Sequence, residues 1–283
     1  LWTWTGFAPH NAFAIATMRE AMRACRAKGV ENVVMTMWGD NGAECSKFAV
    51  LPALFTVAQM AKGIDNEAAI HANFEEKFGI PFEGFRALDL TGTQNDSTEA
   101  IYNPDKYLLF CDPFMGQFDN RVKSGDAAGY ADCAARLAVY ADHAEYGYLF
   151  RSLRALCAFL SVKADLGIRT RAAYLSGDQK AAKALCADYD AALERLDVFY
   201  AAYEQQWMRD NKPHGFDVQD LRIGGQRQRL LHCRDRLLAY AEGRLDRIEE
   251  LEEPVLDCCC EEKADGQATR AIFWHEIASA NVI

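Results

Sequence analysis

Residues 31–44 carry the side chains of this chain that are best suited to chemistry. A run of β-branched and apolar residues at 33–37 ends in Trp38 and Asp40, with two glycines close by, and a helical pattern follows. This order predicts a buried strand whose end presents an indole next to a carboxylate. An indole packs against the apolar C–H face of a sugar, and a carboxylate accepts hydrogen bonds from its hydroxyls. The alternative is an ordinary strand-to-helix turn, with Trp38 in the core and Asp40 as a helix cap.

The elements around this segment predict an α/β arrangement. A tryptophan-rich loop at residues 2–11 precedes a helical pattern, which leads into the predicted strand and then into a second helix over residues 44–62. This order of loop, helix, strand and helix is typical of α/β folds. In α/β barrels the active site lies where the strands end and the following helices begin.

Two motifs resemble a known family. Trp-Thr-Gly-Phe-Ala-Pro-His-Asn at residues 4–11 and Met-Trp-Gly-Asp-Asn-Gly-Ala-Glu-Cys-Ser at residues 37–46 resemble the end of the catalytic barrel of glycoside hydrolase family 20, the β-N-acetylhexosaminidases. Within that family the chain is most similar to the bacterial N-acetylglucosaminidases that carry a helical C-terminal domain. The resemblance continues through residues 212–217 and 222–225 to residues 277–283, and so spans the whole chain.

The resemblance implies an activity and also shows what this chain lacks. Family members remove terminal N-acetylglucosamine or N-acetylgalactosamine from glycans with retention of configuration. An Asp-Glu pair orients the 2-acetamido group and protonates the leaving oxygen, while the acetamido carbonyl attacks the anomeric carbon. No Asp-Glu dipeptide occurs in the 283 residues. We therefore expect the C-terminal portion of a longer enzyme, beginning inside the barrel, without catalytic residues of its own and inactive as a fragment.

The resemblance also implies roles for four binding residues. Trp38 is expected to form a wall of the subsite for the non-reducing sugar, and Asp40 to accept hydrogen bonds from its O4 and O6 hydroxyls. Many relatives have Glu in place of Asp40. Trp2 and Trp4 are expected to face the cleft together, because alternate residues of an extended segment face the same side. Glu44 is interpreted as a residue of the first helical turn that interacts with the helix dipole, or as a residue at the rim of the site.

The rest of the chain predicts a second, helical domain. We place the boundary at Gly63, so that residues 1–63 are the C-terminal segment of a (β/α)8 barrel and residues 64–283 a helical C-terminal domain. The fold class is therefore α/β followed by all-α. Residues 81–126 predict short helices and long connections. Four stretches with 3.6-residue periodicity predict the long helices of a bundle. They are residues 127–145, 148–166, 178–209 and 218–242, with Asp178 and Asp217 as caps.

Composition excludes several classes of function. The formal net charge of −10 and the absence of a basic cluster argue against nucleic acid as a partner. No apolar run approaches the ~20 residues that span a bilayer, so no membrane segment is expected. The expected partner is a glycan that contains N-acetylhexosamine, and no cofactor is expected. Dimerisation and covering the bottom of the barrel are both compatible with the helical domain.

Ten cysteines raise the question of metal sites and disulfides. Seven stand alone, mostly at helical positions among Ala and Leu, where a free thiol packs as a small hydrophobe. Residues 258–260 are three adjacent cysteines that could bind a soft metal, but no CxxC pair occurs, and we expect no metal site. Unpaired cysteines in this number favour a reducing cytoplasm.

A second hypothesis belongs to a different class of protein. The chain could be a non-catalytic helical interaction module whose first sixty residues form an α/β cap. The enzyme hypothesis requires an Asp-Glu pair at a strand end encoded upstream of Leu1, whereas the interaction module predicts none.

Overall fold

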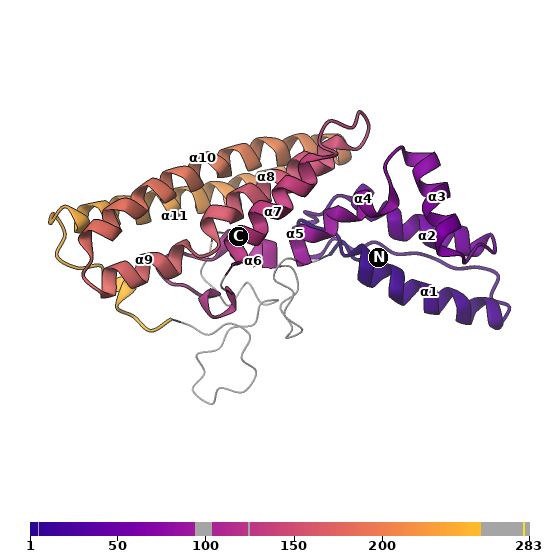
Figure 1. Ribbon diagram of the computed structural model, residues 1–283, viewed down its shortest axis with the longest axis horizontal. Helices are drawn as coiled ribbons and strands as arrows, with labels where there is room; N and C mark the ends of the chain where they lie inside the picture. The colour runs from indigo at the N-terminus through magenta and orange to yellow at the C-terminus, as the bar shows by residue number, and fades with distance from the viewer. Residues whose placement is uncertain (5, 94–103, 124, 256–279, 281–283) are drawn as a thin grey trace.

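The computed structural model describes the chain except residues 5, 94–103, 124, 256–279 and 281–283. All regular structure in the described part is helical (Figure 1). The α-helices are α1 (Asn11–Ala27), α2 (Leu51–Ala61), α3 (Glu67–Phe78), α4 (Phe82–Arg86), α5 (Leu90–Thr93), α6 (Pro104–Phe110), α7 (Asp126–Ala138), α8 (Gly147–Lys163), α9 (Leu166–Leu175), α10 (Gln179–Asp210) and α11 (Phe216–Ala241). Five 3₁₀ turns are η1 (Asp40–Gly42), η2 (Lys47–Val50), η3 (Ala87–Asp89), η4 (Asp119–Arg121) and η5 (Glu249–Leu251).

Helices α7, α8, α10 and α11 form the predicted bundle. Helix α8 packs between α7 and α10, and α11 packs on α10 along its length (Figure 1). The four observed helices fall on the four periodic stretches of the sequence, although α7 is shorter than predicted. Asp178 caps α10 as expected, because its side chain accepts a hydrogen bond from the backbone N–H of Ala181. Asp217 lies within the first turn of α11, and its side chain accepts from the N–H of Gly215.

The bundle forms because α10 buries one continuous stripe. Its buried side chains recur three or four residues apart, which places them on one face of the helix. They are Ala182, Leu185, Cys186, Tyr189, Ala192, Leu193, Leu196, Phe199, Tyr203, Gln206 and Trp207. The core cysteine prediction is confirmed for the described thiols, since six of the seven are buried and no disulfide joins any two of them. Residues 258–260, with the metal hypothesis attached to them, lie outside the described residues.

Short elements join the bundle to the N-terminal part of the chain. Helices α4, α5 and α6 with η3 and η4 confirm the prediction of short helices and long connections over the described part of residues 81–126. All seven residues of α6 are buried. Helix α6 packs on α8, and Figure 1 shows α5 and α6 between the bundle and helices α1–α4.

The predicted strand at residues 33–37 is wrong for the structure described. The segment is extended but belongs to no sheet, and no strand occurs among the described residues. Met35 packs against the buried cluster of Met22, Val57 and Met60 from α1 and α2, while Val34 is 86% exposed. A strand requires a neighbour that pairs with its backbone N–H and C=O groups. Among the described residues the amino group of Leu1 donates to the carbonyl oxygen of Thr36 at 2.9 Å, but no second strand lies beside the segment and no ladder forms.

The helix predicted over residues 44–62 begins later than expected. Ser46 caps the turn η2, its Oγ accepting from the N–H of Phe48 at 3.2 Å, and α2 follows with Pro52 in its first turn. Glu44 therefore precedes the helix, and its interpretation as a first-turn residue is wrong. Helix α2 ends before Gly63, as predicted.

One hydrophobic core connects the two ends of the chain. Phe7 and Ala8 belong to the same buried cluster as the bundle. The ring of Phe7 meets Phe199 and Tyr203 of α10 edge to face, with centroids 5.4 and 5.2 Å apart. The N-terminal segment is thus packed against the bundle, and the domain boundary at residue 63 stays a prediction. In the described part of the chain, every helix is too short or too polar to cross a bilayer.

Candidate functional site

A cavity of about 360 Å³ lies next to the N-terminal segment. The residues that line it come from residues 1–4, from helix α1 and from the segment that leads into η1. They are Leu1, Trp2, Trp4, Phe13, Ala14, Thr17, Met18, Trp38 and Asp40. All four residues expected to bind a sugar are therefore brought together at one cavity, although 34 positions separate Trp4 from Trp38 in the sequence.

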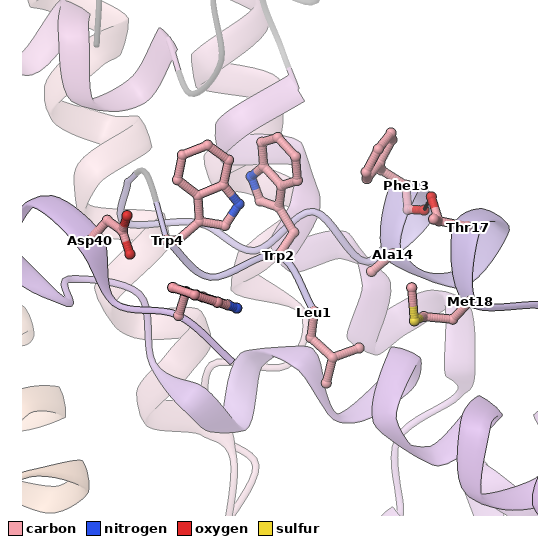
Figure 2. Close-up of a pocket in the computed structure, with 9 residues that line it drawn as sticks. Leu1, Trp2, Trp4, Phe13, Ala14, Thr17, Met18 and Asp40 are labelled. Carbon is pink, nitrogen blue, oxygen red and sulfur yellow. Dashed lines mark hydrogen bonds between the residues drawn. The ribbon is translucent and has the colours of Figure 1, made fainter. Parts of the chain in front are cut away.

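Trp2 and Trp4 form one side of this cavity. Their ring centroids are 4.9 Å apart with the planes tilted by 52°, so the two rings lie against each other on one side of the segment. Phe13 of α1 meets Trp2 edge to face at 5.2 Å. In Figure 2, Asp40 lies beside Trp4 at one end of the cavity, and Leu1, Ala14 and Met18 lie toward the other.

Trp38 is held by its backbone while its ring stays accessible. The side chain is 60% exposed, which is unusual for tryptophan and excludes the alternative that places it in the core. Its carbonyl oxygen accepts hydrogen bonds from Thr3 Oγ1 at 2.8 Å and from Lys47 Nζ at 2.6 Å. Its indole N–H donates to Thr36 Oγ1 at 3.0 Å. Thr3 is buried, so these contacts fasten the Trp38 segment to the Trp2–Trp4 segment. Partial burial lowers the pKa of Lys47.

Asp40 opens a tight turn with a constrained backbone. The turn η1 ends at Ala43, which has φ 52° and is the one non-glycine residue of the described chain in the left-handed region. Gly42 has φ 123°, and a Cβ there would lie 2.6 Å from Nη1 of Arg222. Left-handed backbone costs an alanine about 1–2 kcal/mol, so surrounding contacts must maintain it.

Below this turn lies a buried cluster of charges. Glu44 and Lys106 have fully buried side chains, and Lys106 Nζ lies 2.9 and 2.7 Å from the two carboxylate oxygens of Glu44. Arg222 of α11 donates to Glu44 Oε1 at 3.1 Å. Burial lowers the pKa of Lys106, and the charge of Glu44 opposes that shift. Sequence reasoning missed this cluster because its members are 62 and 178 positions apart.

Two further buried carboxylates fix the N-terminal segment. Asp105 accepts from the N–H of Phe7 at 3.2 Å, and burial raises its pKa to about 7. Asp89 accepts from the N–H groups of Asn11 and Ala12, and so satisfies the start of helix α1 from another element. Burial raises the pKa of Asp89, while these hydrogen bonds oppose the shift. His10 also caps α1, with Nδ1 accepting from the N–H of Phe13 at 3.4 Å.

A second hollow is larger but lacks this chemistry. A groove of about 680 Å³ lies between α1, α2 and residues 30–35, and apolar side chains such as Met22, Val33 and Val57 make up much of its wall. None of the four predicted binding residues lines it. The smaller cavity has aromatic faces and, among its described lining residues, one titratable side chain, Asp40. Such a lining suits binding of a ligand that has both an apolar face and hydroxyl donors. No group of His, Cys, Asp and Glu suited to a metal occurs among the described residues.

The fold and the cavity together define a helical domain joined to a segment that carries an aromatic and acidic cavity. The family model described as Glycoside Hydrolase 20C C-terminal domain matches residues 81–270, which is more than half of the chain. The chain belongs to this family, and its resemblance to glycoside hydrolase family 20 is confirmed. No curated protein matches the chain. The four cavity residues lie outside the matched range.

Proposed function

We propose that this chain is the C-terminal portion of a retaining, substrate-assisted β-N-acetylhexosaminidase. In this proposal residues 1–63 lie at the end of the (β/α)8 barrel, and upstream barrel strands supply the pairing partner that residues 33–37 do not have among the described residues. The cavity formed by Trp2, Trp4, Trp38 and Asp40 is part of the subsite for a terminal N-acetylhexosamine. The observation that carries the proposal is the meeting of these four residues at one cavity within a chain of the glycoside hydrolase 20C family.

The chemistry of the cavity supports a sugar ligand. A pyranose ring has apolar C–H faces that pack on indole rings, and equatorial or axial hydroxyls that donate to a carboxylate. Trp38 offers an exposed ring, and Asp40 is an exposed acid on a turn two residues later. We assign Trp38 to the wall of the subsite and Asp40 to the O4 and O6 hydroxyls.

The division of roles follows from what the cavity contains. Its described lining has no second carboxylate within reach of Asp40 to act as an acid–base partner. General acid protonation and orientation of the acetamido group are therefore assigned to an Asp-Glu pair supplied by the upstream part of the barrel. The chain contributes ground-state and transition-state binding, and the upstream part contributes the proton transfer.

A binding experiment tests the subsite directly. Residues 1–283 labelled with ¹⁵N are titrated with N-acetylglucosamine while the indole N–H signals are followed. We expect the signals of Trp2, Trp4 and Trp38 to shift together. Trp207 serves as an internal control, because it is buried on α10 and its indole donates to the Lys212 carbonyl in the loop before α11. The Asp40→Asn variant should weaken the response, and Asp142→Asn, at an exposed site away from the cavity, should not. Equal shifts at Trp207 and Trp38, or none at any indole up to high sugar concentration, contradict the proposal.

A second observation tests the enzyme as a whole. The coding sequence upstream of Leu1 should contain an Asp-Glu pair at the end of a predicted strand. An upstream sequence without that pair favours the alternative of a non-catalytic helical module. We also propose a reducing, cytoplasmic location, because no disulfide joins any two of the seven described cysteines.

A further inference from the structure

The buried charges below the Asp40 turn give the helical domain a role at the sugar subsite. We propose that Arg222 and Lys106 are positioning residues, which hold Glu44 and thereby fix the turn that presents Asp40. This inference deepens the proposed function and rests on it. It assigns to the helical domain the task of setting the geometry of the subsite.

Glu44 lies close to Asp40 along the chain. Only three residues separate it from Asp40, and those three include Gly42 and the left-handed Ala43. The backbone between the two acids is therefore short and constrained. Because this connection is short and constrained, a displacement of the Glu44 side chain also displaces Asp40.

The contacts around Glu44 are directional. Both carboxylate oxygens are engaged, with Lys106 of α6 touching both and Arg222 of α11 donating to one of them. Hydrogen bonds to ionised groups depend strongly on angle and distance, so three of them define one position for the carboxylate. Apolar side chains of the same volume would fill the space without defining that position.

The three charged side chains are buried at an energetic cost. Burying an ion pair costs desolvation that its attraction barely repays, so well-packed apolar residues would serve stability as well or better. Glu44 and Lys106 have no exposed side-chain surface, and Arg222 retains only 11%. We therefore attribute the burial of these three charged side chains to a role in positioning a neighbouring element and not to stability. The element that they orient is the constrained turn of Asp40, since a Cβ at Gly42 would lie only 2.6 Å from the Arg222 guanidinium.

The inference predicts a local change when Arg222 is replaced. In residues 1–283, Arg222→Met should speed amide exchange at residues 40–44 by about tenfold or more, while exchange in α8 and α10 stays unchanged. Arg227→Met is the matched control, because Arg227 lies on the same helix and pairs with Asp197 at the surface. Arg222→Lys keeps the charge and should restore part of the protection. Unchanged exchange at residues 40–44 in a folded Arg222→Met chain overturns the inference.

Kinetics of the full-length protein that contains this chain separate the inference from the proposed function. Misplacing Asp40 should lower kcat/KM for aryl N-acetyl-β-glucosaminides by roughly 10- to 100-fold in Arg222→Met. The loss should disappear when Asp40→Asn is already present, because a positioning residue has nothing left to position. If Asp40→Asn has no effect, the proposed function fails. If Asp40→Asn lowers kcat/KM but Arg222→Met adds its full loss on top, the inference fails while the proposed function stands.

Discussion

The pH dependence of stability provides a direct test of the buried junction between the N-terminal segment and the bundle. Asp105 is fully buried at that junction, and burial raises its pKa from 3.8 to about 7. The folded chain therefore holds a proton on Asp105 that the unfolded chain releases above pH 4. Stability from this group is fully present below the unfolded pKa and is lost as the pH rises through the folded value.

The magnitude follows from the two pKa values. Because the pKa of Asp105 differs between the folded and the unfolded chain, its contribution to the free energy of unfolding is about 2–3 kcal/mol smaller at pH 8 than at pH 5. Asp105→Asn keeps an oxygen that accepts from the N–H of Phe7 and removes the titration. Between pH 5 and pH 8 the free energy of unfolding of the wild-type chain should therefore fall by about 2–3 kcal/mol more than that of Asp105→Asn. The other titratable groups change the free energy of unfolding of both proteins alike.

Urea unfolding of both proteins at pH 5, 6, 7 and 8, at constant ionic strength, measures this difference. Asp142→Asn serves as the control for removal of one carboxylate at an exposed position. Parallel curves for wild type and Asp105→Asn would refute the reasoning, because they would mean that Asp105 titrates alike in the folded and unfolded chain.

Four further outcomes are expected. Trp38→Ala in the full-length protein should lower kcat/KM on the order of 30- to 1000-fold. Asp40→Asn should cost about 1.5–3 kcal/mol of transition-state stabilisation, with a smaller effect on 4-deoxy or 6-deoxy substrates. If both variants keep kcat/KM within twofold of the parent, Trp38 and Asp40 are turn residues. Residues 1–283 alone should not hydrolyse aryl N-acetyl-β-glucosaminides, as an overnight assay would show. Asp89→Ala leaves the first N–H groups of α1 without their acceptor, so thermal unfolding should report a loss of about 2–4 kcal/mol. Amide exchange at residues 33–37 should be faster than in α8, and equal protection would contradict their unpaired state.

The sequence predicts the bundle well because its helices are long and strongly periodic. The pattern that marks α10 continues for nine turns, and Asp178 supplies a cap that requires no tertiary information. Local sequence patterns mispredict the structure of a segment where contacts with residues distant in the sequence determine its conformation. Residues 33–37 form the β-branched and apolar run that is typical of a strand, but the described residues place no second strand beside them, and α1 and α2 provide the contact instead.

The candidate site was only partly predictable for a similar reason. Trp2, Trp4, Trp38 and Asp40 could be selected by residue type and by resemblance, and the structure places them at one cavity. The role of Glu44 could not, because nothing near it in the sequence indicates that Lys106 and Arg222 approach it from two other helices. A buried ion cluster leaves no local pattern, since each member appears in the sequence as an ordinary surface charge.

The packing of Phe7 against α10 limits how this chain can be recombined in evolution. A gene fusion that transferred only the helices from residue 64 onward would expose the recess made by Phe199 and Tyr203 and leave Asp105 without the N–H of Phe7. The helical domain should therefore be inherited together with the loop at residues 4–11, so that related genes share both segments or neither. Chimeras joined before the loop should express as folded protein, whereas chimeras joined at residue 63 with an unrelated barrel end should aggregate.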